Sequence, residues 1–141
     1  MRILTVFGLV ILALLGLGWS AWAQSSDVVE AELNGLHLTI DAASGGLLKL
    51  EYAGMTMLRA TPESASLLDA AYPGYGFEPL RLGTRYSKDA RVEVVDGALS
   101  ITWDALGMSR AFAPEGRVPA SVRIEPAPDG HNVAITASID N

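Results

Sequence analysis

Hydrophobic and polar residues alternate along several short stretches of this chain. In Leu36–Asp41, leucine and isoleucine alternate with polar side chains, which is the period of a β-strand with one buried face. Residues Ala42–Gly46 then provide a turn containing two glycines, which tolerate positive φ angles. The alternation resumes in Leu47–Tyr52, so the two stretches predict a hairpin. The residues expected on the apolar face of its second strand are Leu48, Leu50 and Tyr52.

The same pattern recurs to the end of the chain, separated by short turns. Asn34-Gly35 favours a type I′ turn, in which both central residues need φ > 0. Short hairpins and one-faced strands are typical of antiparallel sheets, and such sheets must cover their apolar face. The pattern therefore predicts an all-β fold, an antiparallel β-sandwich of seven to nine strands. Besides the hairpin above, the predicted strands are Val28–Leu33, Met55–Leu58, an irregular Phe77–Thr84, Ala90–Val95, Leu99–Trp103, Val118–Glu125 and Val133–Ile139.

One central region interrupts the alternation. Pro62–Ala71 is compatible with a short helical turn, with Thr61 as its N-cap and Pro62 as its first helical residue. The following Tyr72–Phe77 contains a proline and two glycines, which predicts a loop.

The N-terminus has the pattern of a secretory signal peptide. Met1–Ala23 is apolar with Arg2 as its only charge, and it ends in Ala-Trp-Ala, the small-residue form of a cleavage site. We expect a signal-peptide helix, cleavage between Ala23 and Gln24, and a periplasmic or extracellular domain of residues 24–141 without membrane contact. The alternative is an uncleaved anchor in the inner membrane, because the segment is long enough to span a bilayer.

Charge and cysteine content exclude several classes of function. The chain has 16 acidic and 10 basic residues, a net charge of −6, which disfavours nucleic acid as a partner because phosphate binding needs a basic surface. An acidic surface agrees with an exported protein that stays soluble. Without cysteine, the chain has no disulfides, no cysteine nucleophile and no thiolate metal site.

No motif predicts a metal, a cofactor or a catalytic centre. The histidines, His37 and His131, lack partners at metal-ligand spacing. Ser109 stands in Gly-Met-Ser-Arg, which is not the Gly-x-Ser-x-Gly nucleophile elbow. Gly74-Tyr75-Gly76 does not open a helix after a strand, as a dinucleotide fingerprint would.

Aromatic residues gather in the central loop and suggest binding. Tyr72, Tyr75 and Phe77 lie beside Glu78, and sugar rings stack their C–H faces on aromatic rings carried by loops. The alternative is that these rings, with Phe112, cover an open end of the sandwich. Trp103 continues a buried face and is expected in the core. Glu78 is also the candidate acid if two carboxylates act together in a small glycoside hydrolase.

Two segments carry a resemblance to a known family. Gly35–Asp41 followed by Ser44–Leu47, together with Asp129–Asn141, resembles the N-terminal part of galactose mutarotase-like β-supersandwich domains. Such domains occur in secreted bacterial glycoside hydrolases and other carbohydrate-active proteins. The resemblance implies that the chain is a fragment or a reduced version of a larger domain. It also implies that the catalytic acids belong to a downstream domain absent from this chain, so no catalytic residue is assigned.

Three functions are therefore expected in order of preference. The first is an exported, non-catalytic module that contacts glycan or serves as a scaffold for a glycoside hydrolase. The second is a structural or protein-interaction module of the cell envelope. The third is the small carboxylate-dependent glycoside hydrolase.

Overall fold

The computed structural model describes residues 27–72, 80–109 and 117–140, and this part of the chain is all-β. It contains ten strands and one short 3₁₀ turn, Thr84–Tyr86, and none of its helices is long and apolar enough to cross a membrane. The predicted signal-peptide helix, Met1–Ala23, lies outside the described residues. The strands are β1 (Val28–Leu33), β2 (Leu36–Asp41), β3 (Leu47–Tyr52), β4 (Met55–Arg59), β5 (Asp69–Tyr72), β6 (Leu80–Gly83), β7 (Ala90–Val95), β8 (Ala98–Trp103), β9 (Ala120–Pro126) and β10 (Val133–Ile139).

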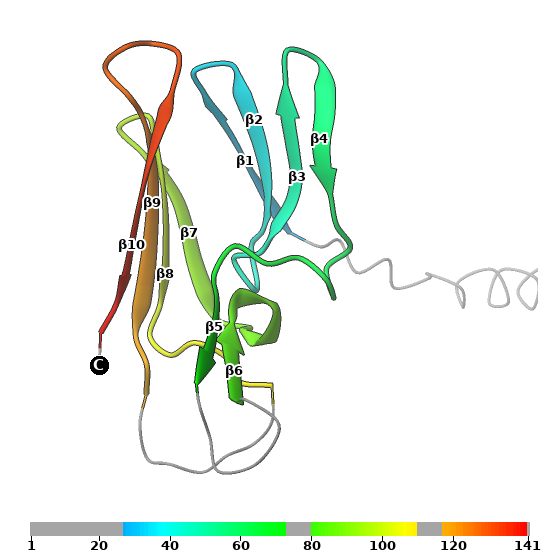
Figure 1. Cartoon of the computed structure of the whole chain (residues 1–141), viewed down its shortest axis with the longest axis vertical. Coiled ribbons are helices and arrows are strands. Elements are labelled where there is room, and N and C mark those ends of the chain that lie inside the picture. Colours follow the sequence, from blue (N-terminus) through cyan, green and yellow to red (C-terminus); the bar gives the residue numbers. More distant parts are fainter. Residues whose placement is uncertain (1–26, 73–79, 110–116, 141) are drawn as a thin grey trace, which may run out of the picture.

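The strands form three antiparallel sheets (Figure 1). One four-stranded sheet has the order β1-β2-β3-β4 and the other has the order β10-β9-β8-β7, so each is a meander of successive hairpins. The third sheet is the β5–β6 hairpin, which lies at the end of the molecule opposite the turns of the long hairpins. The prediction of antiparallel hairpins is confirmed, with ten strands in place of seven to nine.

Residues from both four-stranded sheets share one buried core. Leu33 and Ile40 of the first sheet and Leu99, Ile101 and Ile124 of the second are at most 1% exposed. The core position predicted for Trp103 is confirmed, since its side chain is 2% exposed. Two one-faced sheets that bury their apolar sides against each other give the molecule a sandwich-like architecture.

The apolar face of β3 differs from the prediction. The register of the β2–β3 pairing shifts by one residue between Thr39 and Ile40, so that Ile40 lies opposite Leu47 rather than Leu48. Because a bulge adds one residue to one strand, it changes which side chain faces the core. Leu47 is therefore buried and Leu48 only partly so, while Tyr52 is 46% exposed.

The helical turn predicted over Pro62–Ala71 is wrong beyond its first residues. The N–H groups of Ser64 and Ala65 both donate to the carbonyl of Thr61, at 3.0 and 2.8 Å, which makes one turn. The Ser64 hydroxyl caps that turn by accepting the N–H of Thr61 at 3.0 Å. The chain then extends, and residues 69–71 belong to β5, because pairing with β6 satisfies their backbone groups.

The outer strand of the second sheet also departs from the sequence prediction. We expected Val133, Ile135, Ala137 and Ile139 to form a buried face. They do lie on the core-facing side of the sheet, because Ile135 is opposite Ile124 in the core and Ala137 is opposite Val122. Ile135 is nevertheless 64% exposed, and of these four residues only Val133 packs against the buried core cluster.

Candidate functional site

The predicted binding residues map to the β5–β6 hairpin. Tyr72 is the last residue of β5 and pairs with Leu80, the first residue of β6, so it belongs to a strand and not to the predicted loop. Tyr75, Phe77 and Glu78 lie outside the described residues, as does Phe112. In the sequence, Tyr75, Phe77 and Glu78 fall between Tyr72 and Leu80, which are direct partners in the sheet.

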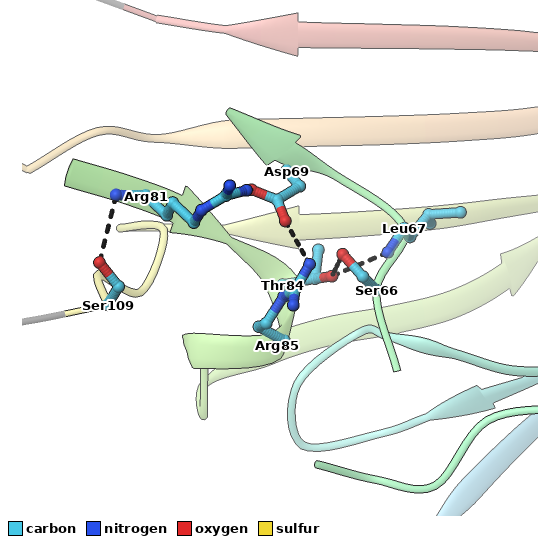
Figure 2. A network of polar contacts seen from close by, with 7 residues as sticks. All are labelled: Ser66, Leu67, Asp69, Arg81, Thr84, Arg85 and Ser109. Atoms are coloured by element: carbon cyan, nitrogen blue, oxygen red, sulfur yellow. Dashed lines mark hydrogen bonds and ion pairs between the residues drawn. The ribbon is translucent and has the colours of Figure 1, made fainter. Parts of the chain in front are cut away.

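The β6 strand is hydrogen bonded on both of its sides. β5 pairs with one edge, and residues 107–109 bind the other. There the N–H of Gly83 donates to the carbonyl of Gly107 at 3.0 Å, and the N–H of Ser109 donates to the carbonyl of Arg81 at 2.8 Å. The Ser109 hydroxyl accepts the N–H of Arg81 at 3.2 Å (Figure 2). Ser109 thus has a structural role in holding β6.

A buried threonine joins the start of β5 to the end of β6. Thr84 is fully buried, and its N–H donates to the carbonyl of Leu68 at 2.9 Å. Its hydroxyl accepts the N–H of Leu67 at 2.8 Å and lies 3.4 Å from the Ser66 hydroxyl (Figure 2). Buried polar groups that are all paired hold a backbone in one conformation.

Charges also cross the hairpin. The Asp69 carboxylate accepts a hydrogen bond from the Arg85 guanidinium, and the Arg81 guanidinium lies 3.9 Å from its other oxygen (Figure 2). The Arg85 guanidinium is also 5.6 Å from the ring centroid of Tyr86, within the range of a cation–π contact. The Asp69 side chain is only 25% exposed, so these contacts help to fix β5 against β6.

A polar groove of about 330 Å³ lies on the outer face of the first sheet. Lys49 and Glu51 form an ion pair at 2.7 Å, and the Thr56 hydroxyl donates to the same carboxylate at 3.0 Å. His37 Nε2 lies 3.9 Å from the Glu32 carboxylate. Opposite charges on neighbouring strands are typical of a solvent-facing sheet, and no phenylalanine, tyrosine or tryptophan lines the groove.

The described residues contain no group of three or more histidine, aspartate or glutamate side chains that could hold a metal ion. His37 lies on the polar face of β2, as predicted, and His131 is exposed beside the β9–β10 turn.

Three exposed carboxyl groups have lowered pKa values. The hydrogen bond from Lys49, followed by that from Thr56, lowers the pKa of Glu51. Backbone and side-chain hydrogen bonds at its own turn lower the pKa of Glu63. The N–H of His131, and then the Asn132 side chain, lower the pKa of Asp129. A general acid in glycoside hydrolysis needs a raised pKa, so none of these three carboxyl groups is suited to that role.

The sequence pattern does not predict the network of Asp69, Arg81, Thr84 and Arg85. The sequence carries only a weak signal for this network, because its three charged residues are far apart in the chain. The predicted helical turn over Pro62–Ala71 also places Asp69 in the wrong kind of element. Recognising β5 as a strand opposite Leu80–Gly83 would have placed Asp69 opposite Gly83, beside both arginines.

Comparisons with known proteins identify no relative. No protein-family model matches the chain, and no curated protein or solved structure is significantly similar to it.

Proposed function

We propose that this chain is an exported, non-catalytic β-sandwich module that contacts glycan through the connection between β5 and β6. The residues proposed to contact it are Tyr72, Tyr75, Phe77 and Glu78. We also propose that the chain is related to the galactose mutarotase-like domains of carbohydrate-active proteins. In this proposal the signal peptide directs export and is cleaved between Ala23 and Gln24.

The observation that supports it is the pairing of Tyr72 with Leu80. Two paired residues are about 5 Å apart, so the aromatic stretch between them starts and returns at one place on the molecule. The hairpin beneath is held by the 107–109 segment and by Thr84, so a ligand would meet a fixed base. A base that is ordered in advance reduces the entropy lost on binding.

We propose binding and not hydrolysis. Among the described residues, the carboxyl groups with resolved pKa shifts, those of Glu51, Glu63 and Asp129, have lowered values, so none of these three is suited to be the general acid of a hydrolase. Glu78 serves in this proposal as a hydrogen-bond acceptor for sugar hydroxyls, beside rings that stack on the sugar face.

Isothermal titration calorimetry tests the proposal. The sample is the protein as isolated from the producing cell, after any natural processing of its N-terminus. The probes are soluble β-glucan, xylan and galactan, with released reducing ends measured in the same samples. We expect binding to at least one polysaccharide without turnover, and weakening by about tenfold or more in Tyr75→Ala, since one lost stacking contact is worth about 1.4 kcal/mol.

Tyr52→Ala is the matched control, because Tyr52 is an exposed tyrosine on β3. Equal weakening in both variants would contradict the assignment to the β5–β6 connection. Binding to none of the polysaccharides would contradict glycan recognition itself. Turnover that disappears in Glu78→Gln would replace the proposal with the hydrolase.

A further inference from the structure

The outer edge of β10 carries backbone groups that pair with no described strand. The hydrogen bonds from the Ala127 N–H to the Asn132 carbonyl, 2.9 Å, and from the Asp140 N–H to the Pro119 carbonyl, 3.0 Å, fix which residues bond to β9. Hydrogen-bonded and non-hydrogen-bonded pairs alternate in an antiparallel ladder. The backbone groups of the odd-numbered residues of β10 therefore point away from β9, and no described strand pairs with them. These residues are Val133, Ile135, Ala137 and Ile139.

This edge lacks the features that usually protect an exposed strand. Natural edge strands carry charges, prolines or bulges that prevent pairing with other chains. Among the edge strands of the two larger sheets, β10 alone has no charged residue, and it is also the longest. The charged residues on the other three edges are Glu30 and Glu32 on β1, Arg59 on β4, and Arg91 and Glu93 on β7.

An apolar row accompanies the free backbone groups. Ile135 is 64% exposed and Ile139 is 44% exposed, although both stand on the core-facing side of the sheet. A partner strand laid along β10 would satisfy the backbone groups and cover this row at the same time. The partner must therefore offer a strand whose apolar residues stand at every second position.

The sequence of β10 is self-complementary in this respect. We propose that β10 pairs antiparallel with β10 of a second copy, joining the two sheets into one eight-stranded sheet. With Thr136 on the two-fold axis, Val133 faces Ile139 and Ile135 faces Ala137, so each apolar residue meets an apolar one. All four facing pairs are hydrogen-bonded pairs in this register.

Charge makes this edge more favourable for the contact between two copies than the acidic parts of the surface. Each chain has a net charge of −6, so two copies repel each other wherever acidic surfaces meet. Pairing through an uncharged strand keeps the nearest charged residue of β9, Arg123, three strand spacings from its counterpart, about 14 Å. Ionic repulsion is largely screened over that distance at physiological salt.

Sedimentation equilibrium tests the association on protein as the producing cell leaves it, with its N-terminus defined by mass spectrometry. We expect a reversible monomer–dimer equilibrium that Ile135→Lys shifts at least tenfold toward monomer. Met57→Lys on β4 is the control, since Met57 is an apolar residue that is 66% exposed and also lies on an edge strand. Ala137→Pro removes an outward N–H without touching the β9 ladder, and it too should weaken the dimer.

A disulfide tests the register, because the chain has no cysteine of its own. On the axis, the two Thr136 Cα atoms would lie about 4.5 Å apart, within disulfide range, so Thr136→Cys should oxidise to a covalent dimer. Ser138→Cys is the control, since its two copies would lie about 14 Å apart along the strands. Both cysteine positions are exposed.

Several outcomes would overturn the proposal. A protein that stays monomeric at about 1 mM, where even a weak contact is populated, would contradict pairing with a second copy. A dimer insensitive to both Ile135→Lys and Ala137→Pro, or equally weakened by Met57→Lys, would place the interface elsewhere. Equal disulfide formation at positions 136 and 138 would rule out the register. Circular dichroism of each variant separates loss of pairing from loss of folding.

Discussion

The indole N–H of Trp103 donates a hydrogen bond to the main-chain carbonyl of Ser44, 2.8 Å away and 59 residues earlier in the chain. Trp103 ends β8 in one sheet, and Ser44 lies in the β2–β3 turn of the other. The turn is itself closed by Asp41, whose carboxylate accepts the Ser44 N–H at 2.9 Å. One buried contact therefore connects the two large sheets at this end of the core.

We expect Trp103→Phe to lower the free energy of unfolding by about 1–3 kcal/mol, because the Ser44 carbonyl would stay buried without its donor. Urea unfolding followed by circular dichroism measures the change. Ser100→Ala, on the partly exposed opposite face of β8, is the control and should shift stability by about 0.5 kcal/mol or less. An unchanged midpoint in Trp103→Phe would show that the bond contributes nothing.

Gly45→Ala should be far more damaging than Gly54→Ala. Both glycines have positive φ, +73° and +78°, so alanine is strained by about 1–2 kcal/mol at either position. At Gly45 the new Cβ would also lie 2.5 Å from Trp103 Cζ2, whereas nothing lies within 4 Å at Gly54. Overpacking adds about 1–3 kcal/mol. Thermal unfolding of both variants tests the difference, and equal losses would show that the turn moves away from Trp103 at little cost.

Asp69→Asn should weaken the β5–β6 hairpin modestly, by about 1 kcal/mol or less, because the ion pairs with Arg85 and Arg81 remain partly exposed. A double-mutant cycle with Arg85→Gln measures the coupling, which should fall as salt is added. The Arg91–Asp104 pair, 2.7 Å apart but with both side chains at least 66% exposed, is the control and should show coupling near zero. Similar coupling in the two cycles would contradict a special role for Asp69.

The pKa of Asp129 should depend on its turn. The N–H of His131 and the Asn132 side chain lower it, so the carboxylate stabilises the folded turn above the ordinary aspartate range. That stabilisation is lost as pH falls through the lowered pKa. We expect Asn132→Ala to raise the Asp129 pKa, although not to its ordinary value, because the backbone donors remain. Carbon-detected NMR titration tests this, and an unchanged pKa would show that Asn132 does not contribute.

Most of the strands could be predicted from the sequence, because each long hairpin carries its own pattern. Asn34, with φ +50°, and Gly35, with φ +78°, form the turn that their residue types predict. Alternation also identified β7, β8 and β10 with accurate bounds. The candidate site was less predictable. β5 has four residues and depends on β6 and Thr84 for its pairing, so it has no clear local pattern.

The all-β class and the order of hairpins follow from the sequence alone, since a period of two and turn chemistry are local properties. Which apolar faces are covered depends on the packing of the two sheets. Ile101 and Ile135 have the same local pattern, yet Ile101 is fully buried and Ile135 is 64% exposed. The difference is physical, because burial depends on whether the opposite sheet extends over a strand. Whether the opposite sheet covers a strand depends on how the two sheets pack and not on the strand's own sequence.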